Sequence, residues 1–81
     1  MKKHKIVKVE WEDSASYSGW TKREKTEEFD PYLCISCGIL VRTKRGSIGV
    51  THSISKQDVD NVMVIPRKTI KKIETIGDIR I

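Results

Sequence analysis

Hydrophobic and polar residues alternate along several stretches of the chain, and the first of these runs from Ile6 to Glu12. Val7, Val9 and Trp11 share one face of this stretch, while charged residues take the other face. A period of two is the pattern of a β-strand with one buried face, so we expect Trp11 to lie in the core. The basic residues 1–4 ahead of the strand are expected to form a tail.

The longest alternating stretch, YLCISCGILVRT, covers residues 32–43 and predicts the strongest strand. Most of its large aliphatic side chains stand at odd-numbered positions, so the pattern predicts a buried face that consists of Leu33, Ile35, Cys37, Ile39 and Val41, with Leu40 on the other face. Gly38 in the middle of the stretch indicates a bend or a bulge, as at the corner of a small barrel.

A tight turn at residues 44–46 leads into a third alternating stretch, so the second and third stretches are predicted to pair as a hairpin. The apolar face of the third stretch holds Ile48, Val50, His52 and Ile54. His52 is therefore interpreted as a core or rim residue and not as a ligand or a catalytic group.

Pro66 interrupts the apolar pattern near the end of the chain. A polar turn at residues 56–61 comes before a short strand at 61–65, and strand character resumes at 71–76. A single turn that begins with Pro between two strands is typical of a 3₁₀ link. The final residues 77–81 are expected either to fray or to extend the last strand.

A polar loop and a charged segment separate the first two strands. Residues 10–20 read EWEDSASYSGW, and the Asp, Ser and Gly among them favour a loop. Thr21 stands three residues before Glu24, which is the capping-box spacing, so residues 22–29 are predicted to form a short helix or an ordered loop. Pro31 ends this element, because the residue before a proline is driven out of the helical region.

This order of elements resembles the SH3-like and Sm-like small β-barrels, in which a 3₁₀ turn joins the last two strands. The segment NVMVIPRKTIKKIETI, residues 61–76, carries the resemblance. It implies a mainly β fold, a five-stranded small barrel with one short helix or ordered loop inserted after the first strand. An α+β sheet with one packed helix is the alternative. In both cases the 81 residues form a single domain.

A narrower resemblance is carried by the segments VEWEDS, SGW, CISCGIL and VIPRKTI. Together they are similar to segments of small uncharacterised proteins encoded by tailed bacteriophages. The resemblance implies a virus-encoded accessory protein that acts on a host component or a defence signal.

The chain has a net charge of +5 and a pI near 9.4, which favours an anionic partner such as a nucleotide or a nucleic acid. A solvated surface of mixed charge is the alternative, because 16 Lys and Arg face 11 Asp and Glu. No stretch approaches the roughly 20 apolar residues that span a bilayer, and the N-terminus lacks the features of a signal peptide. We therefore expect a cytoplasmic protein without a membrane partner.

Cys34 and Cys37 form a lone CxxC motif inside the second predicted strand. Residues three apart on a strand point to opposite faces, and their Cα atoms stand roughly 10 Å apart, too far for a disulfide. A zinc site needs more ligands, and only His4 and His52 are available. The motif is interpreted as structural, with Cys37 in the core and Cys34 on the other face, and a metal or thiol site is the alternative. No metal or cofactor is expected.

Two groups of residues are candidates for ligand binding. The first group consists of basic side chains at the two turns: Arg42, Lys44, Arg45, Arg67 and Lys68. Arginine offers a planar fork to phosphate and lysine a point charge, and plain solvation of these charges is the alternative. The second group lies in the loop and consists of Ser14, Tyr17 and Trp20. These side chains would either stack on a base or pack locally, with Trp20 as a hydrophobic staple for the helix.

These observations favour a non-catalytic binding module that sequesters or scaffolds an anionic ligand, either a nucleotide-like molecule or a short nucleic acid. An enzyme is not expected, because no Ser/His/Asp arrangement and no glycine-rich phosphate loop occurs. The small core and the edge strands of a domain this size favour a homo-oligomer. The alternative is an inhibitor or adaptor that docks on a host protein through residues 13–20.

Overall fold

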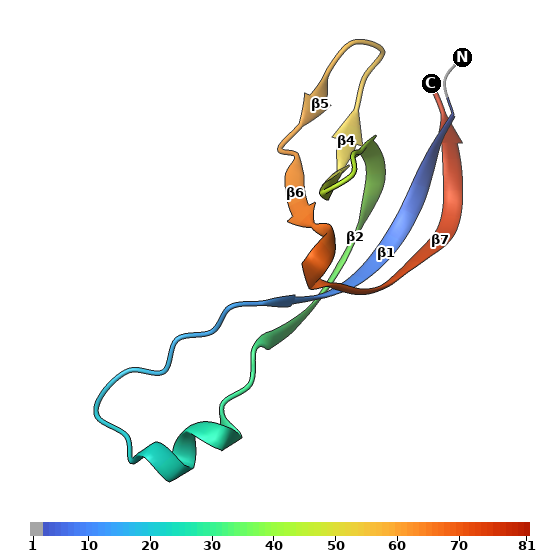
Figure 1. Ribbon diagram of the computed structural model, residues 1–81. Helices are drawn as coiled ribbons and strands as arrows, with labels where there is room; N and C mark the ends of the chain where they lie inside the picture. Colours follow the sequence, from blue (N-terminus) through green and yellow to red (C-terminus); the bar gives the residue numbers. More distant parts are fainter. Residues whose placement is uncertain (1–2) are drawn as a thin grey trace.

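The computed structural model describes residues 3–81, and most of them lie in β-strands. Five strands form one antiparallel sheet in the order β6-β3-β2-β1-β7 (Figure 1). Their bounds are β1 Lys3–Asp13, β2 Tyr32–Thr43, β3 Ser47–Thr51, β6 Met63–Pro66 and β7 Ile70–Arg80. A second, two-stranded sheet is made of β4 Ser53–Ile54 and β5 Val59–Asp60. The mainly β class predicted from the alternation is confirmed.

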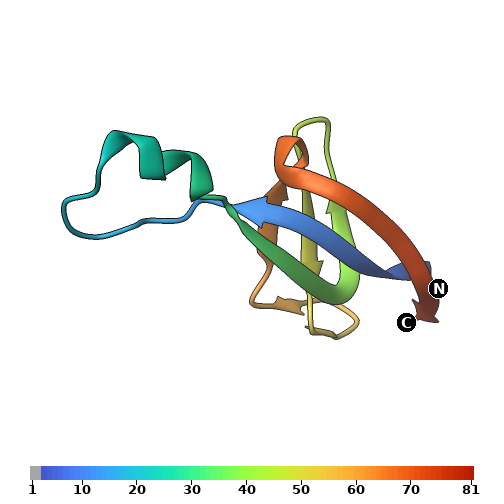
Figure 2. The same cartoon turned by 90° about the horizontal axis from the view of Figure 1, so that it is seen from below.

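The strands β6 and β7 are the two edges of the five-stranded sheet. The short 3₁₀ helix η2, Arg67–Thr69, joins them, which confirms the link predicted from Pro66. The sheet curls, so that β1 and β7 cross the direction of β3 and β6 (Figure 2). No ladder joins β6 to β7 within residues 3–81, so the sheet is open.

The core lies on the inner face of this curl. Its fully buried apolar residues are Val7, Val9, Ile48, Val50 and Ile65. Trp11, Leu40 and Ile70 pack against them and are partly buried, so the prediction that Trp11 belongs to the core is confirmed. Each buried Val or Ile contributes about 1.5–3 kcal/mol relative to an exposed side chain, so a core of five such residues is small.

The buried face of β2 is the opposite of the one predicted. Residues that stand opposite each other on antiparallel strands point to the same face. Trp11 stands opposite Cys34, and Val9 and Val7 stand opposite Ser36 and Gly38. The small residues of β2 therefore face the core, because β1 already supplies the large side chains on that side.

The large aliphatic side chains at the start of β2 point outward. Leu33 is 62% exposed, Ile35 is 58% exposed and Cys37 is also exposed. Ile39 and Val41, farther along the strand, are half-buried. The prediction that these five residues line the core is therefore wrong for the first three. The alternation shows which residues share a face, but the neighbouring strand decides which face is buried.

Gly38 lies where the backbone of β3 crosses close to β2. A Cβ atom at this position would stand 2.8 Å from the carbonyl oxygen of Thr51, so only glycine fits without a shift of the backbone. The register then slips by one residue between Leu40 and Arg42, which places a bulge at Val41. The prediction of a bend or a bulge at Gly38 is thus met by a bulge three residues later.

The third predicted strand ends earlier than its alternation indicates. Thr51 is buried and its hydroxyl donates to the carbonyl oxygen of Asp60, so the chain leaves the main sheet at this point. His52 follows in the break between β3 and β4 and is exposed. The interpretation of His52 as a core or rim residue of a continuous strand is therefore wrong.

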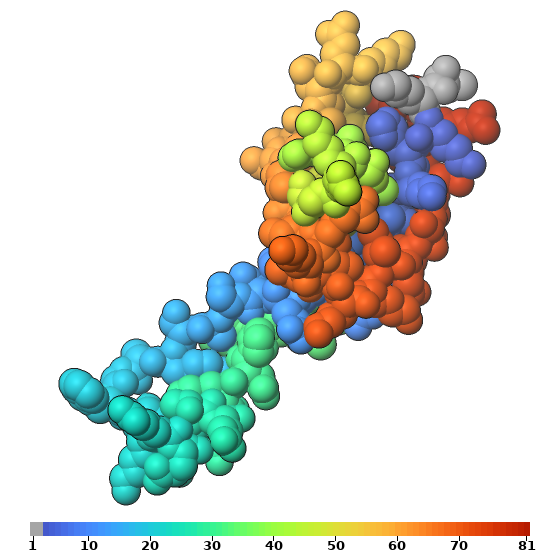
Figure 3. Space-filling model, viewed as in Figure 1, coloured from blue at the N-terminus to red at the C-terminus, as the bar shows by residue number. Residues whose placement is uncertain are grey.

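Residues 14–31 form an arm that projects from the body of the protein (Figures 1 and 3). The molecule measures 57 × 21 × 20 Å as a result. The helical element predicted here is a 3₁₀ helix, η1, Arg23–Glu28. Its N-cap is Lys22 without a side-chain bond, so the capping box predicted for Thr21 and Glu24 does not form.

The first and last strands, β1 and β7, pair with each other in the sheet. Lys3 stands opposite Arg80, and an ion pair of 3.3 Å joins Lys3 Nζ to the carboxylate of Asp78. Of the predicted basic tail, residues 1–2 lie outside the described residues, whereas Lys3 and His4 belong to β1. At the other end β7 continues to Arg80, so residues 77–80 extend the last strand and do not fray.

Candidate binding site at two basic turns

The two basic turns predicted from the sequence are joined by hydrogen bonds. Arg67 donates from Nε to the carbonyl oxygen of Lys44 over 2.8 Å, and from its backbone N–H to the carbonyl oxygen of Gly46 over 3.0 Å. Lys44 in turn donates from its backbone N–H to Ser47 over 2.9 Å, which closes the β2–β3 turn. Pairing of β3 with β6 brings these turns together, because Ser47 stands opposite Pro66.

The joined turns carry a group of cations that we call the turn cluster: Arg42, Lys44, Arg45, Arg67 and Lys68. All five side chains are exposed. Within residues 3–81, the ion pairs are Lys3–Asp78, Lys71–Glu12 and Lys72–Glu74, and none of these includes a member of the turn cluster. The cluster is therefore a surface of positive charge without a paired carboxylate.

Arg42 is the member of the cluster that lies within a strand. It stands opposite Gly49 of β3, and a Cβ atom at Gly49 would come within 3.1 Å of Arg42 Cβ and of Val62 Cγ1. The missing side chain at Gly49 thus lets the stem of Arg42 pack closely against β3. The guanidinium then extends from a defined base, and its loss of side-chain entropy on binding is reduced.

The neighbouring lysines Lys71 and Lys72 lie outside the cluster because carboxylates pair with them. Lys71 Nζ is 3.4 Å from Glu12, and Lys72 Nζ is 3.1 Å from Glu74. The hydrogen bond and charge of Glu74 raise the pKa of Lys72, and Glu10 on the adjacent strand adds to this effect. The outer face of β1 and β7 is thus a solvated surface of alternating charge.

The aromatic residues of the arm differ in what they contact. The ring of Tyr17 stacks on Phe29 with centroids 4.1 Å apart, and its hydroxyl donates to the carbonyl oxygen of Asp30 over 2.8 Å. Trp20 is fully exposed, at 105%, and follows Gly19, whose φ is +87°. Tyr17 therefore packs within the arm, whereas Trp20 projects into solvent and does not act as a hydrophobic staple.

Ser14 stands at the base of the arm, where its backbone N–H bonds the carboxylate of Asp13 over 2.8 Å. The sequence-predicted residues therefore fall into two places. The turn cluster lies on the body, and Ser14, Tyr17 and Trp20 lie on the arm (Figure 3). Within one chain the structure does not bring the aromatic group and the basic group into one site.

The two cysteines occupy the reverse of their predicted positions. Both thiols are free, Cys34 is half-buried on the inner side of β2, and Cys37 is exposed on the outer side. Trp11 opposite Cys34 explains the reversal, because the indole fills the space on the inner side. No group of three or more metal-ligating side chains occurs within residues 3–81.

A hollow of about 410 Å³, which we call the β2 hollow, opens beside the first half of β2. Its lining comes from β2, from the end of β3 and from the start of β6, and consists of Ile35, Ser36, Cys37, Val50, Thr51, His52, Asn61 and Met63. No single stretch of the sequence predicts this hollow, because three separate segments form it. Asn61 has a φ of +39°, and an Asn directly before an apolar stretch is the one local signal of the sharp turn there.

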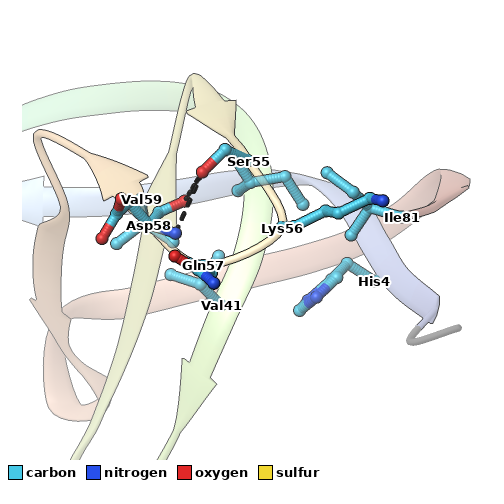
Figure 4. Close-up of a pocket in the computed structure, with 9 residues that line it drawn as sticks. His4, Val41, Ser55, Lys56, Gln57, Asp58, Val59 and Ile81 are labelled. Carbon is cyan, nitrogen blue, oxygen red and sulfur yellow. Dashed lines mark hydrogen bonds between the residues drawn. The ribbon is translucent and has the colours of Figure 1, made fainter.

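A smaller hollow of about 240 Å³ lies between the β4–β5 turn and the ends of the chain (Figure 4). Ser55 and Asp58 close that turn, since the N–H of Ser55 donates to the carbonyl oxygen of Asp58 over 2.8 Å and the N–H of Asp58 donates to Ser55 Oγ over 3.0 Å. Lys56 extends across the hollow toward Ile81 (Figure 4). The hydrogen bonds between Ser55 and the backbone of Asp58 thus serve to close the turn.

None of the helices within residues 3–81 has the length and apolar character that a membrane span requires. Comparison of the chain with models of protein families, with curated proteins and with solved structures finds no match.

Proposed function

We propose that this protein is a non-catalytic binding module for an anionic ligand, either a nucleotide-like molecule or a short nucleic acid, and that the turn cluster is its binding surface. The observation that carries the proposal is the pair of hydrogen bonds from Arg67 to Lys44 and Gly46. They hold two basic turns, which lie more than twenty residues apart in the chain, as one surface.

The chemistry of the cluster suits phosphate groups. Nε of Arg67 is engaged by Lys44, and its terminal nitrogens have no hydrogen-bond partner within residues 3–81. A guanidinium anchored in this way presents donors in a fixed orientation, which favours bidentate contact with phosphate oxygens. Arg42, Arg45 and the two lysines add charge around it, and a ligand bound through several of them would be held mainly by release of counterions.

We also propose a fold resemblance, an oligomeric state and a biological role for this binding module. The 3₁₀ link η2 between β6 and β7 supports the resemblance to SH3-like and Sm-like barrels. The small core and the open sheet support a homo-oligomer, since a second copy would bury surface that one chain leaves exposed. In this proposal the protein is a bacteriophage-type accessory protein that sequesters or scaffolds its ligand in the host cytoplasm.

Salt dependence tests the proposal directly. Binding of a fluorescent single-stranded oligonucleotide and of a fluorescent nucleotide is measured by anisotropy at several salt concentrations. Each phosphate contact contributes about 0.7 to the slope of log K against log salt, so Arg45→Ala and Lys68→Ala should each reduce the slope by about that amount. Lys22→Ala and Lys25→Ala on the arm remove the same charge elsewhere and should leave the slope unchanged. If no anionic probe binds at low salt, or if the arm variants weaken binding equally, the proposal is wrong.

Exposure of Trp20 favours a second candidate function, docking on a host protein through the arm. A fully exposed tryptophan on the projecting arm has the character of a binding hot spot, where an aromatic anchor enters a pocket of the partner. Trp20→Ala should then abolish capture of that partner and leave oligonucleotide binding intact. The reverse result, loss of oligonucleotide binding in Trp20→Ala, would assign the arm to the anionic site.

A further inference from the structure

The first half of β2 has a free backbone edge. On one side β2 pairs with β1 from Tyr32 to Ile39, but on the other side it pairs with β3 only from Ile39 to Thr43. Within residues 3–81, no backbone hydrogen bond from another segment reaches Tyr32–Gly38 on this second side. The N–H and C=O groups there are open to a further strand.

The other free edges of the sheet are protected against pairing. The edge strand β7 carries the charged residues Lys71, Lys72, Glu74, Asp78 and Arg80. The edge strand β6 is four residues long and ends in Pro66. Charges, Pro and short length are the devices by which natural sheets prevent association of their edges. The segment Tyr32–Gly38 reads YLCISCG, with neither a charge nor a proline, so it is the edge without protection.

Exposed apolar side chains lie beside the free edge of β2. Leu33 and Ile35 are 62% and 58% exposed on the outer face, and Cys37 is exposed in line with them. The β2 hollow opens at the same place and is lined by residues 35–37 on one side and by His52, Asn61 and Met63 on the other. A strand added to the edge would bond the free backbone groups, cover the apolar stripe and close the hollow.

We propose that the added strand is β2 of a second copy of this chain, antiparallel to the first, with the two-fold axis at Ile35. Opposed residues on antiparallel strands point to the same face, so the axis must pass through a residue position and not between two residues. Pro31 bounds the free length at one end, and Thr51, which stands opposite Ile39, bounds it at the other. Ile35 is its middle position, and an axis there places Leu33 opposite Cys37 of the other copy.

Self-complementarity of the exposed stripe favours a second copy over another extended peptide, because an axis at Ile35 sets Leu33, Ile35 and Cys37 against Cys37, Ile35 and Leu33 of the other copy. On β1, Glu12 stands opposite Leu33, Glu10 opposite Ile35 and Lys8 opposite Cys37. Residues that stand opposite each other across the four strands β1, β2, β2 and β1 form a row. With the axis at Ile35, one row runs from Glu12 of the first copy to Lys8 of the second, and another runs from Lys8 of the first copy to Glu12 of the second. The middle row joins Glu10 to Glu10, but the charged groups of every row stand about 14 Å apart, three strand spacings, so salt largely screens them. Across the dimer interface the strands run in the order β7-β1-β2-β2-β1-β7.

This dimer specifies the homo-oligomer of the proposed function and depends on that part alone, not on the anionic ligand. Residues that face each other on antiparallel strands have Cα atoms about 4.5–5.5 Å apart, which suits a disulfide. Ile35→Cys in a Cys34→Ser, Cys37→Ser background should therefore form a disulfide-linked dimer on mild oxidation. The same exchange at Ile76, which is 56% exposed on β7, is the matched control and should not cross-link.

This register predicts two further cross-linking results. Leu33→Cys should cross-link to the native Cys37 of the other copy when Cys34 is replaced by Ser. The wild-type chain should not cross-link, because the two Cys37 residues would be four positions apart along the strands, roughly 13 Å, and the two Cys34 residues would be diagonal neighbours about 7–8 Å apart, too far for a disulfide. Cross-linking at Ile76 in place of Ile35, or a wild-type chain that sediments as a monomer at high concentration, overturns the proposal.

A charge at the axis provides the complementary measurement. Ile35→Lys places two lysines face to face in the dimer, and such a juxtaposition should weaken dimerisation at least about 100-fold. Ile76→Lys should leave the sedimentation coefficient unchanged. Oligonucleotide binding separates the two proposals: binding retained by monomeric Ile35→Lys leaves the turn cluster intact, and a wild-type chain that dimerises but binds no anionic probe refutes the turn cluster alone. An Ile35→Lys chain that remains dimeric refutes the β2 interface.

Discussion

Trp11 and Ser36 are joined across the β1–β2 ladder by a hydrogen bond of 3.0 Å from the indole Nε1 to the serine Oγ. The indole packs against the core, and its one polar atom needs a partner on the half-buried inner face of β2. Ser36 supplies that partner from a position diagonal to Trp11. The bond therefore explains why a small polar residue lies on the inner face where alternation alone predicts none.

We expect a measurable coupling between these two residues. Ser36→Ala should lower the free energy of unfolding by about 1 kcal/mol, because the indole N–H loses its partner in a partly buried setting. In a Trp11→Phe background the donor is absent, so the same replacement should have little effect. Urea unfolding of the two single variants and the double variant gives the coupling energy. Strictly additive effects would contradict the assignment of this bond.

Gly38 should be the least replaceable glycine among residues 3–81. Gly38→Ala places a Cβ atom 2.8 Å from the carbonyl oxygen of Thr51, so β3 must shift, and we expect a loss of about 1–3 kcal/mol in thermal or urea unfolding. Gly46→Ala is the matched control, because a Cβ atom there meets no atom within 4 Å. Equal effects of the two replacements would show that the approach of Thr51 does not constrain Gly38.

These contacts also explain why the sequence predicts the bounds of β2 but not which of its faces is buried. The period of two in residues 32–43 predicts the bounds of β2 as they are observed. It contains no information on which face β1 will occupy with Trp11, Val9 and Val7, and that packing decides the burial of Cys34 and Cys37. The end of β3 at Thr51 depends likewise on a bond to Asp60, nine residues away.

The candidate site was likewise predictable only in part from the sequence. Basic residues at turns are visible in the sequence because Gly46 and Pro66 mark the turns themselves. Their contact through Arg67 and Lys44 follows from the pairing of β3 with β6, which is a tertiary relationship. The separation of Trp20 from the turn cluster depends on the projection of the arm, and the composition of residues 14–31 does not reveal that direction.

The ion pair between Lys72 and Glu74 predicts a specific dependence of stability on pH. Its hydrogen bond lowers the pKa of Glu74 and raises that of Lys72. The contribution of Glu74 is therefore present at neutral pH and is lost as the pH falls below about 4, while that of Lys72 is lost only as the pH rises above about 10. The pair is exposed, so the effect is small and is screened by salt.

The measurement is the difference in urea midpoint between the wild-type chain and Glu74→Gln. At low salt the wild type should be the more stable at pH 7, and the difference should vanish near pH 3 and in molar salt. Glu24→Gln on the arm, where no ion pair forms, should leave the midpoint at pH 7 unchanged. A difference that persists at pH 3 would assign the effect to packing and not to charge.

Tyr17 should stabilise the arm without stabilising the body. Tyr17→Ala removes the stack on Phe29 and the bond to Asp30, an aromatic contact worth about 0.5–1.5 kcal/mol. Amide hydrogen exchange in residues 14–31 should accelerate by a few-fold to about tenfold, with exchange in β3 unchanged. Trp20→Ala removes a side chain without contacts and should alter neither. Slower or unchanged exchange in the arm of Tyr17→Ala would contradict this role.

The arm shares β1 and β2 with the body, yet all the fully buried apolar residues belong to the body. Substitutions, insertions and deletions in residues 14–31 therefore leave the packing that folds the chain untouched. Folding of the chain and the surface that the arm presents are thus determined by separate parts of one short sequence.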